Sequence, residues 1–122
     1  MTEIIPYLFY RDVPAALDWL ARVFGFEEVL RHPTAKGMHA EMVLDGRMIM
    51  MGQSDKEQFA PPQPGRPVNA GVFVYVADVS QHHARAQQAG ARIEHSLADH
   101  GYGLTYTARD LEGQIWFFTQ KP

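Results

Sequence analysis

One stretch decides the fold: YGLTYTARDLEGQIWFFTQ, residues 102–120. Two apolar runs flank the tetrapeptide DLEG at 110–113. Asp opens turns by hydrogen-bonding its own backbone, and Gly closes them because it tolerates positive φ. The stretch therefore predicts a β-hairpin.

The register of this hairpin determines which side chains share a face. We expect Arg109 to pair with Gln114, which places Tyr106 opposite Phe117. Directly opposed residues lie on the same face of a sheet. One face then carries Tyr102, Leu104, Tyr106, Ile115 and Phe117, and the other carries Trp116 and Phe118. Since both faces are apolar, we expect helices to cover one and a ligand or a partner to cover the other.

The composition is that of an ordinary folded chain. The 122 residues suit one domain with a sizeable core, and mixed charge with 46% hydrophobic residues argues against disorder. The absence of cysteine removes disulfides, thiolate nucleophiles and thiolate metal sites. The formal charge of −3 argues against a nucleic-acid partner. No apolar run is long enough to cross a bilayer and no secretory leader is recognisable, so we expect a cytoplasmic protein with no membrane partner.

The first half of the chain has the pattern of a strand, a helix and three further strands. Asp12 offers an N-cap, apolar residues then recur at helical spacing, and Gly25 supplies a C-cap. Asp45-Gly46 is a strong signal for a hairpin turn, across which Leu44 should pair with Arg47. The predicted elements are a strand at 4–10, a helix at 15–24, and strands at 26–32, 38–44 and 47–52.

The same order of elements recurs in the second half, after a Pro-rich stretch without periodicity. Asp78 caps a helix that follows a strand at 72–76, and a strand at 92–97 precedes the final hairpin. This duplication predicts an α+β fold in which two βαβββ repeats form a curved eight-stranded mixed sheet around a cleft, with helices on the convex side. We expect a single domain over 1–122, with repeat one at 3–52, the Pro-rich linker at 53–69 and repeat two at 70–120.

Three segments carry a resemblance to a known family: IIPYLFYRDVPAALDWLARVFGFE at 4–27, GMHAEMVLDGRMIMMG at 37–52 and YGLTYTARDLEGQIWFF at 102–118. In them the chain resembles the vicinal oxygen chelate superfamily of glyoxalases, extradiol dioxygenases and bleomycin-resistance proteins, and above all its small single-domain PhnB-like branch. The resemblance implies the eight-stranded fold and a homodimer. It leaves the function open, because this scaffold supports several activities.

Metal-dependent members of that superfamily take their ligands from the first and last strand of each half. The resemblance carries those positions onto Ile5, Met50, Gly71 and Phe117. None of these side chains suits a divalent cation, which prefers oxygen or imidazole nitrogen, and a shift of one residue supplies no ligand either. We therefore expect no metal, no other cofactor and no catalytic residue.

The alternation of strand residues predicts which side chains line the cleft. Glu41 should oppose Met50 in the first hairpin, and His39 should oppose Gly52. The predicted ligand-binding set is aromatic and Met-rich, with one acid and one imidazole: Tyr7, Phe9, His39, Glu41, Met48, Met50, Phe73, Tyr75, Tyr102, Tyr106 and Phe117. Aromatic faces and thioethers bind flat, polarizable molecules by stacking and dispersion, which predicts a small hydrophobic or aromatic ligand.

These residues favour a non-enzymatic protein that confers resistance by sequestering an antibiotic-type natural product, either planar aromatic or peptide. The alternative is a metal-dependent glyoxalase-like lyase or dioxygenase, with a divalent metal at a site rebuilt around His39 and Glu41 and with His100 as a third group. A further alternative is a scaffold without a small-molecule ligand, whose aromatic residues fill the core as they do in most proteins. His82 and His83, on the second helix, are expected to be exposed to solvent.

Overall fold

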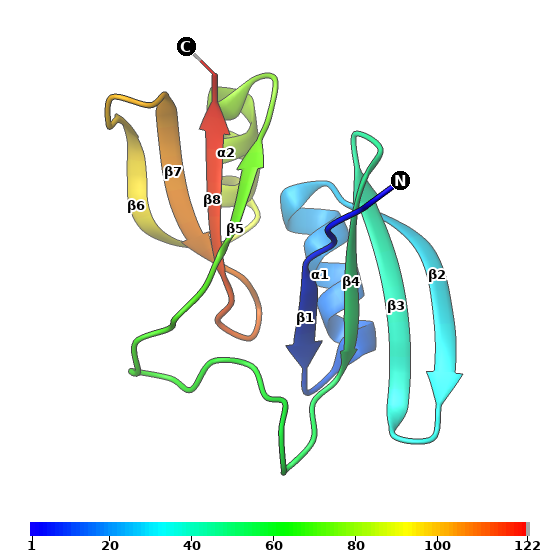
Figure 1. Ribbon diagram of the computed structural model, residues 1–122. Helices are drawn as coiled ribbons and strands as arrows, with labels where there is room; N and C mark the ends of the chain where they lie inside the picture. The colour runs from blue at the N-terminus through cyan, green and yellow to red at the C-terminus, as the bar shows by residue number, and fades with distance from the viewer. Residues whose placement is uncertain (122) are drawn as a thin grey trace. The chain divides into compact units, whose positions relative to one another are not determined.

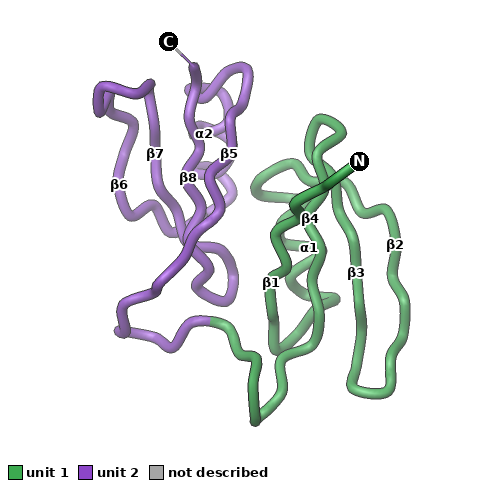
Figure 2. Tube along the Cα trace, in the orientation of Figure 1, with its two compact units in different colours: residues 1–61 green, residues 62–122 purple. Residues whose placement is uncertain are grey.

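Two compact units make up the chain, Met1–Pro61 and Pro62–Pro122 (Figure 2). The computed structural model describes residues 1–121. Each unit contains one helix and one four-stranded sheet (Figure 1). The α+β class and the two βαβββ repeats expected from the sequence are therefore confirmed.

The elements follow the same order in both units. The first unit contains β1 (Tyr7–Tyr10), α1 (Val13–Phe24), β2 (Glu27–Thr34), β3 (Gly37–Leu44) and β4 (Arg47–Gln53). The second unit contains β5 (Val72–Tyr75), α2 (Val79–Gln88), β6 (Arg92–Asp99), β7 (Leu104–Arg109) and β8 (Ile115–Gln120). Residues 54–71 form neither helix nor strand, as the Pro-rich composition predicts.

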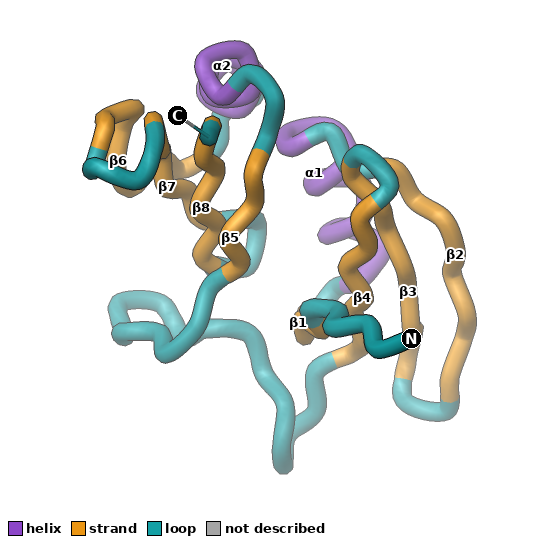
Figure 3. Tube along the Cα trace, turned by 45° about the horizontal axis from the view of Figure 1, so that its top comes forward, coloured by secondary structure: helices purple, strands orange, loops and turns teal. Residues whose placement is uncertain are grey.

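In each sheet the first strand pairs in parallel with the last, and the other neighbours are antiparallel. The strand orders are β1-β4-β3-β2 and β5-β8-β7-β6. Each helix lies against one face of its own sheet (Figure 3). In the first unit the covered face buries Ala40, Met42 and Met51. We call the face of each sheet opposite its helix the open face.

Both helices begin at the N-cap residues that the sequence predicts, and α1 also ends at its predicted C-cap. Asp12 Oδ1 accepts a hydrogen bond from the Ala15 backbone N–H at 3.0 Å. Asp78 Oδ1 accepts one from the Gln81 backbone N–H, also at 3.0 Å. Gly25 ends α1 in the left-handed conformation, with φ of 86°, which a residue without Cβ adopts at no steric cost.

Strand β1 starts later than the expected residue 4. Pro6 has no N–H to donate to a ladder, so regular pairing can begin only after it. The carbonyl of Pro6 accepts from Met50 N at 3.0 Å, and Tyr7 then pairs with Met50. At the far end of the chain, β6 extends beyond the expected residue 97 to Asp99.

The register of the first hairpin is the predicted one. Leu44 pairs with Arg47, and the pairs Glu41 with Met50 and His39 with Gly52 follow from it. The two turn residues at 45 and 46 have φ values of 49° and 76°. Positive φ at both positions is what a two-residue type I′ turn requires, so the DG signal identified both the turn and the register.

The register expected for the second hairpin is wrong by one residue. Arg109 pairs with Ile115 and not with Gln114. The Asp110 N–H donates to the Gln114 carbonyl at 2.9 Å, so the loop has three residues, 111–113. Gly113, with φ of 95°, is the left-handed residue that closes a three-residue hairpin loop. A slip of one residue moves every side chain of β7 to the opposite face.

Tyr106 is the predicted site residue that this slip displaces. It is fully buried, it pairs with Phe118, and its hydroxyl lies 2.6 Å from Nδ1 of His82 on α2. Burial raises the pKa of the Tyr106 phenol, which therefore stays protonated. The prediction that Tyr106 shares a face with Phe117 is wrong. Thr105 and Thr107 lie on that open face of the sheet instead.

The histidines of α2 are half-buried, so the expectation that they are exposed is also wrong. α2 buries only Val79 and Ala86 as apolar residues, and its imidazoles complete the cover over Tyr106. The His83 ring packs edge-on against Tyr106 with centroids 4.8 Å apart. Among residues 1–121, His83 Nε2 is the buried side-chain nitrogen that has no hydrogen-bond partner.

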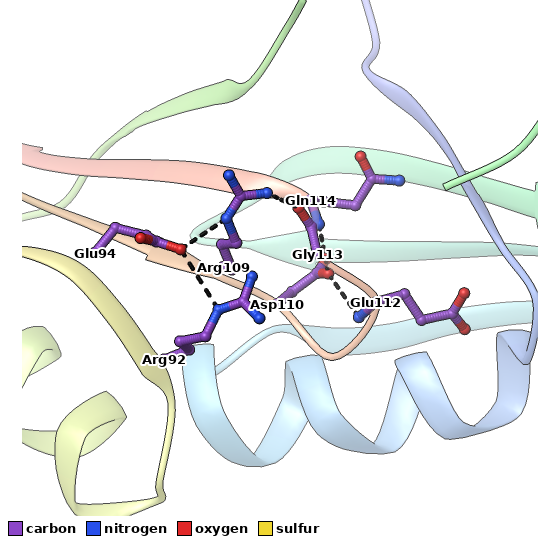
Figure 4. Close-up of polar contacts among 7 residues, drawn as sticks. All are labelled: Arg92, Glu94, Arg109, Asp110, Glu112, Gly113 and Gln114. Atoms are coloured by element: carbon purple, nitrogen blue, oxygen red, sulfur yellow. Dashed lines mark hydrogen bonds and ion pairs between the residues drawn. The ribbon is translucent and has the colours of Figure 1, made fainter. Parts of the chain in front are cut away.

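Asp110 organises the turn between β7 and β8 (Figure 4). Its Oδ1 accepts hydrogen bonds from the backbone N–H groups of Glu112 and Gln114, at 3.1 and 3.0 Å. Its Oδ2 accepts from Trp116 Nε1 at 3.0 Å, inside the core of the unit. The carboxylate thus links the turn to the covered face of the sheet.

Arg109 stabilises the same hairpin from its other side (Figure 4). Its Nη1 donates to the Gly113 carbonyl at 3.0 Å, and its Nε donates to Glu94 Oε1 at 2.7 Å. The same oxygen of Glu94 lies 3.4 Å from Arg92 Nε. Arg109 and Asp110 thus both stabilise the turn between β7 and β8. No helix in the described part of the chain is both long and apolar enough to span a membrane.

Candidate functional site

The open face of the first unit brings together most of the predicted ligand-binding residues of that unit. Tyr7 pairs with Met50 and Phe9 pairs with Gly52, so both rings project on the face opposite the buried Tyr10. The residues on this face are Tyr7, Phe9, His39, Glu41, Met48 and Met50. Their common face is the one that strand alternation predicts. Their role in binding a ligand remains a prediction.

Three of these side chains form a continuous hydrogen-bonded chain, which we call the relay. The Tyr7 hydroxyl lies 2.9 Å from His39 Nδ1, and His39 Nε2 lies 2.8 Å from Glu41 Oε2. The side chains of His39 and Glu41 are only 23% and 18% exposed. Burial, and then the negative charge of Glu41, raise the pKa of Tyr7. The phenol therefore keeps its proton at neutral pH.

Gly52 makes the relay geometrically feasible. Strand β4 lies between β1 and β3, so the Tyr7 ring must cross β4 to reach His39. A Cβ on residue 52 would lie 2.7 Å from the Tyr7 hydroxyl, well inside van der Waals contact. The absence of a side chain at Gly52 thus provides the space in which the phenol lies.

A second aromatic contact on this face comes from the Pro-rich segment. The Phe59 ring stacks on the Phe9 ring with centroids 4.3 Å apart and planes 7° apart. Phe59 remains 43% exposed, so its outer side faces solvent. Phe59 was not predicted from the sequence, because a segment without periodicity does not indicate which of its side chains contacts the sheet.

Asp55 anchors the segment that carries Phe59. Its Oδ1 accepts hydrogen bonds from the backbone N–H groups of Glu57, Gln58 and Phe59, at 2.9, 2.7 and 2.9 Å. The Asp55 N–H in turn donates to the Phe59 carbonyl at 2.8 Å. These hydrogen bonds stabilise the ionised carboxylate and lower the pKa of Asp55 to about 2. The bond from the Phe59 N–H makes the largest contribution.

Acidification is expected to release Phe59 from Phe9. A depressed carboxyl pKa stabilises the folded segment above the ordinary aspartate value of roughly 4, and this stabilisation is lost as the pH falls toward about 2. Carbon-detected NMR should follow the Asp55 carboxyl while the Phe59 ring protons report the stacking. Asp55→Asn should loosen the stack at neutral pH. An Asp55 midpoint near 4 with unchanged ring shifts would contradict this anchoring role.

The open face of the second unit is aromatic but has no relay. Phe73 and Phe117 are paired across β5 and β8, with ring centroids 6.1 Å apart. Tyr75 meets Phe73 edge-on at 5.3 Å, and Tyr102, which precedes β7, lies 6.1 Å from Phe73. Phe73, Tyr75 and Tyr102 are each about half exposed. The His100 ring stacks against Tyr102 at 5.9 Å.

The four positions onto which the resemblance carries the metal ligands of metal-dependent relatives have no oxygen or imidazole side-chain donor: Ile5, Met50, Gly71 and Phe117. Met50 lies beside Tyr7, and the Phe117 ring lies against Gly71, where an added Cβ would approach it to 2.9 Å. Thioether and aromatic carbon are poor donors for hard or borderline cations. Within residues 1–121, no three His, Cys, Asp or Glu side chains gather closely enough to hold a metal ion.

The sequence of the chain matches a known protein family over nearly its whole length. The matching family model is that of the Glyoxalase/Bleomycin resistance protein/Dioxygenase superfamily, over residues 4–118. The chain belongs to this superfamily. The resemblance found in the sequence is therefore confirmed, and the two βαβββ repeats are the fold of its small single-domain members.

Solved structures with the same fold align with nearly the whole chain. TioX from Micromonospora sp. ML1 is 36% identical, with a TM-score of 0.77 over 99% of this chain and 97% of that chain. TnmS3, an antibiotic binding protein from Streptomyces sp. CB03234, is 17% identical, with a TM-score of 0.73 over 99% and 98%. FosX, a fosfomycin resistance protein from Listeria monocytogenes, is 13% identical, with a TM-score of 0.73 over 100% and 94%. At their lower identities, TnmS3 and FosX show the shared fold alone.

Proposed function

We propose that this protein binds and sequesters a planar aromatic or peptide natural product of the antibiotic type, without a metal, and so confers resistance. The observation that carries the proposal is the ring cluster on the open face of the first unit. There the rings of Tyr7 and Phe9 lie 5.2 Å apart, and Phe59 stacks on Phe9. Half-exposed rings held in fixed orientations bind flat molecules well, because they lose little conformational entropy on binding.

The comparisons support this proposal at the level of the superfamily. TnmS3 is an antibiotic binding protein, and FosX is a fosfomycin resistance protein. TioX is the more similar in sequence, at 36% identity.

We also propose that the protein is a cytoplasmic homodimer, as the resemblance to this superfamily implies. Sedimentation velocity of the purified protein measures the oligomeric state, and a monomer at micromolar concentration would contradict the dimer.

A second candidate function is catalysis of the glyoxalase or dioxygenase type, with a divalent metal. The observation that favours it is the contact of 2.8 Å between His39 and Glu41, which places an imidazole and a carboxylate on one face. A mutant of FosX has also been solved in complex with Mn(II). His39 and Glu41 supply only two ligands, so this candidate needs a third donor from elsewhere.

Thermal unfolding of metal-stripped protein distinguishes the two candidates. A ligand that binds only the folded state stabilises it by about 2.7 kcal/mol at a concentration 100 times its Kd. We expect planar antibiotics to raise Tm, and we expect Ni²⁺, Zn²⁺, Mn²⁺ and Fe²⁺ to leave Tm unchanged. A rise with a metal that disappears in His39→Ala would instead support the enzyme.

A further inference from the structure

We propose that the relay makes the ligand site selective for planar molecules that carry a hydrogen-bond donor at the ring edge, such as a phenolic O–H or an amide N–H. This inference rests on the proposed function and adds the chemical class of its ligand. It follows from the direction of the hydrogen bonds between Tyr7, His39 and Glu41. Nothing in the fold itself requires these bonds, as the second unit shows.

The direction of the relay is set at its buried end. An ionised carboxylate only accepts hydrogen bonds, so His39 Nε2, 2.8 Å from Glu41 Oε2, must carry a proton. A neutral imidazole has one N–H, which leaves Nδ1 as an acceptor. The contact of 2.9 Å between His39 Nδ1 and the Tyr7 hydroxyl is then a bond in which Tyr7 donates. The opposite ring tautomer would direct a lone pair of Nε2 at the carboxylate.

The outer end of the relay is therefore an acceptor. Tyr7 has used its hydroxyl proton, and the remaining lone pairs of Oη can only accept a hydrogen bond. Tyr7 is 44% exposed on the open face, so a ligand can approach it. The negative charge of Glu41 makes the electrostatic potential at this end of the relay more negative. This favours a hydrogen-bond donor on the ligand and disfavours a ligand carboxylate or carbonyl.

The acceptor lies beside the stacked rings. The ring centroids of Tyr7 and Phe9 are 5.2 Å apart, and those of Phe9 and Phe59 are 4.3 Å apart. A flat molecule that stacks on this cluster has its edge within reach of Tyr7 Oη. The site thus recognises two features of a ligand together: a planar ring, and a hydrogen-bond donor at the edge of that ring.

The second unit shows that the relay is not a requirement of the fold. Strand pairing aligns Tyr7 with Phe73, which lacks a hydroxyl. By the same pairing, the positions of His39 and Gly52 are taken by Thr105 and Thr119, whose hydroxyls lie 2.9 Å apart. The same four-stranded sheet therefore folds with a short threonine pair at these positions. Among residues 1–121, the relay is therefore found in the first unit and not in the second.

The probes 2-naphthol and 2-methoxynaphthalene, which differ by one methyl group, test the inference. Both present the same rings, but only 2-naphthol donates a hydrogen bond. At pH 8, titration followed by probe fluorescence should give 2-naphthol the lower Kd by about 3- to 10-fold, the range of one hydrogen bond in water. Tyr7→Phe removes only Oη and should equalise the two Kd values.

Glu41→Gln provides a second variant that keeps Tyr7 in place. A carboxamide can donate to His39 Nε2, which permits the other ring tautomer and turns Nδ1 into a donor toward Tyr7. The preference for 2-naphthol should shrink or reverse. Equal binding of both probes to the unaltered protein, or a preference that persists in Tyr7→Phe, would overturn the relay inference and leave the proposed function intact. If neither probe binds, the aromatic site fails, and the inference fails with it.

Discussion

Replacing Asp110 with alanine is expected to lower the free energy of unfolding by about 3 kcal/mol, because one buried carboxylate satisfies three donors. Asp110 is only 6% exposed. Its Oδ2 accepts from Trp116 Nε1 at 3.0 Å, and its Oδ1 accepts from two backbone N–H groups of the turn. Alanine leaves the buried indole N–H without a partner and frees the turn that sets the register of β7 against β8.

Urea unfolding followed by tryptophan fluorescence measures this effect, since Trp116 lies at the affected contact. Asp110→Asn keeps one acceptor oxygen and should lose less stability than Asp110→Ala. Leu111→Ala, in the same loop, is a matched control, because Leu111 is 48% exposed and its truncation should change stability by less than about 0.5 kcal/mol. A loss below about 1 kcal/mol for Asp110→Ala would show that the turn holds its register without the carboxylate.

The two hairpins show what the sequence can and cannot predict about register. Asp45-Gly46 permits one loop length, because two consecutive residues with positive φ form a two-residue turn. All the pairings of β3 with β4 follow from this loop length. The DLEG tetrapeptide fits loops of three or four residues equally well. In the observed loop of three residues the Asp110 carboxylate accepts from Trp116 Nε1, and a local sequence pattern does not reveal this tertiary contact.

The same distinction applies to the candidate site. Alternation along β1, β3 and β4 predicts that Tyr7, His39 and Glu41 share a face, and the pairing confirms it. Alternation does not predict that Tyr7 crosses β4 to reach His39, because that depends on the missing side chain of Gly52. Phe59 could not be predicted at all, since Asp55 fixes its segment by local backbone bonds that have no sequence period.

Within this superfamily, the chain retains the two repeats and differs between them in chemistry. At equivalent positions the first unit carries a tyrosine, a histidine and a carboxylate, and the second carries a phenylalanine and buried threonines. Two sheets with the same topology therefore offer one polar and one apolar aromatic face.

Replacing Phe9 with alanine is expected to weaken the binding of 2-methoxynaphthalene about tenfold or more, the largest effect on affinity that we predict for a single side chain. Phe9 contacts Tyr7 on one side and supports the stacked Phe59 on the other, so its loss removes a ring and disorders a second one. Loss of one aromatic stacking partner typically costs about 1–3 kcal/mol, which is roughly 5- to 150-fold in Kd. Because this probe makes no donor contact with Tyr7, the loss reports stacking alone.

Three further measurements separate the stacking role of Phe9 from a role in the core. Phe59→Ala should weaken the same probe by a smaller factor, since Phe9 remains. Trp19→Ala is the aromatic control, because Trp19 lies on α1 against Phe24 and away from the open face, and it should leave Kd unchanged. The Tm of each variant is measured alongside. If Phe9→Ala lowers Tm while Kd stays constant, Phe9 belongs to the hydrophobic core, and the ligand must bind elsewhere on the aromatic faces.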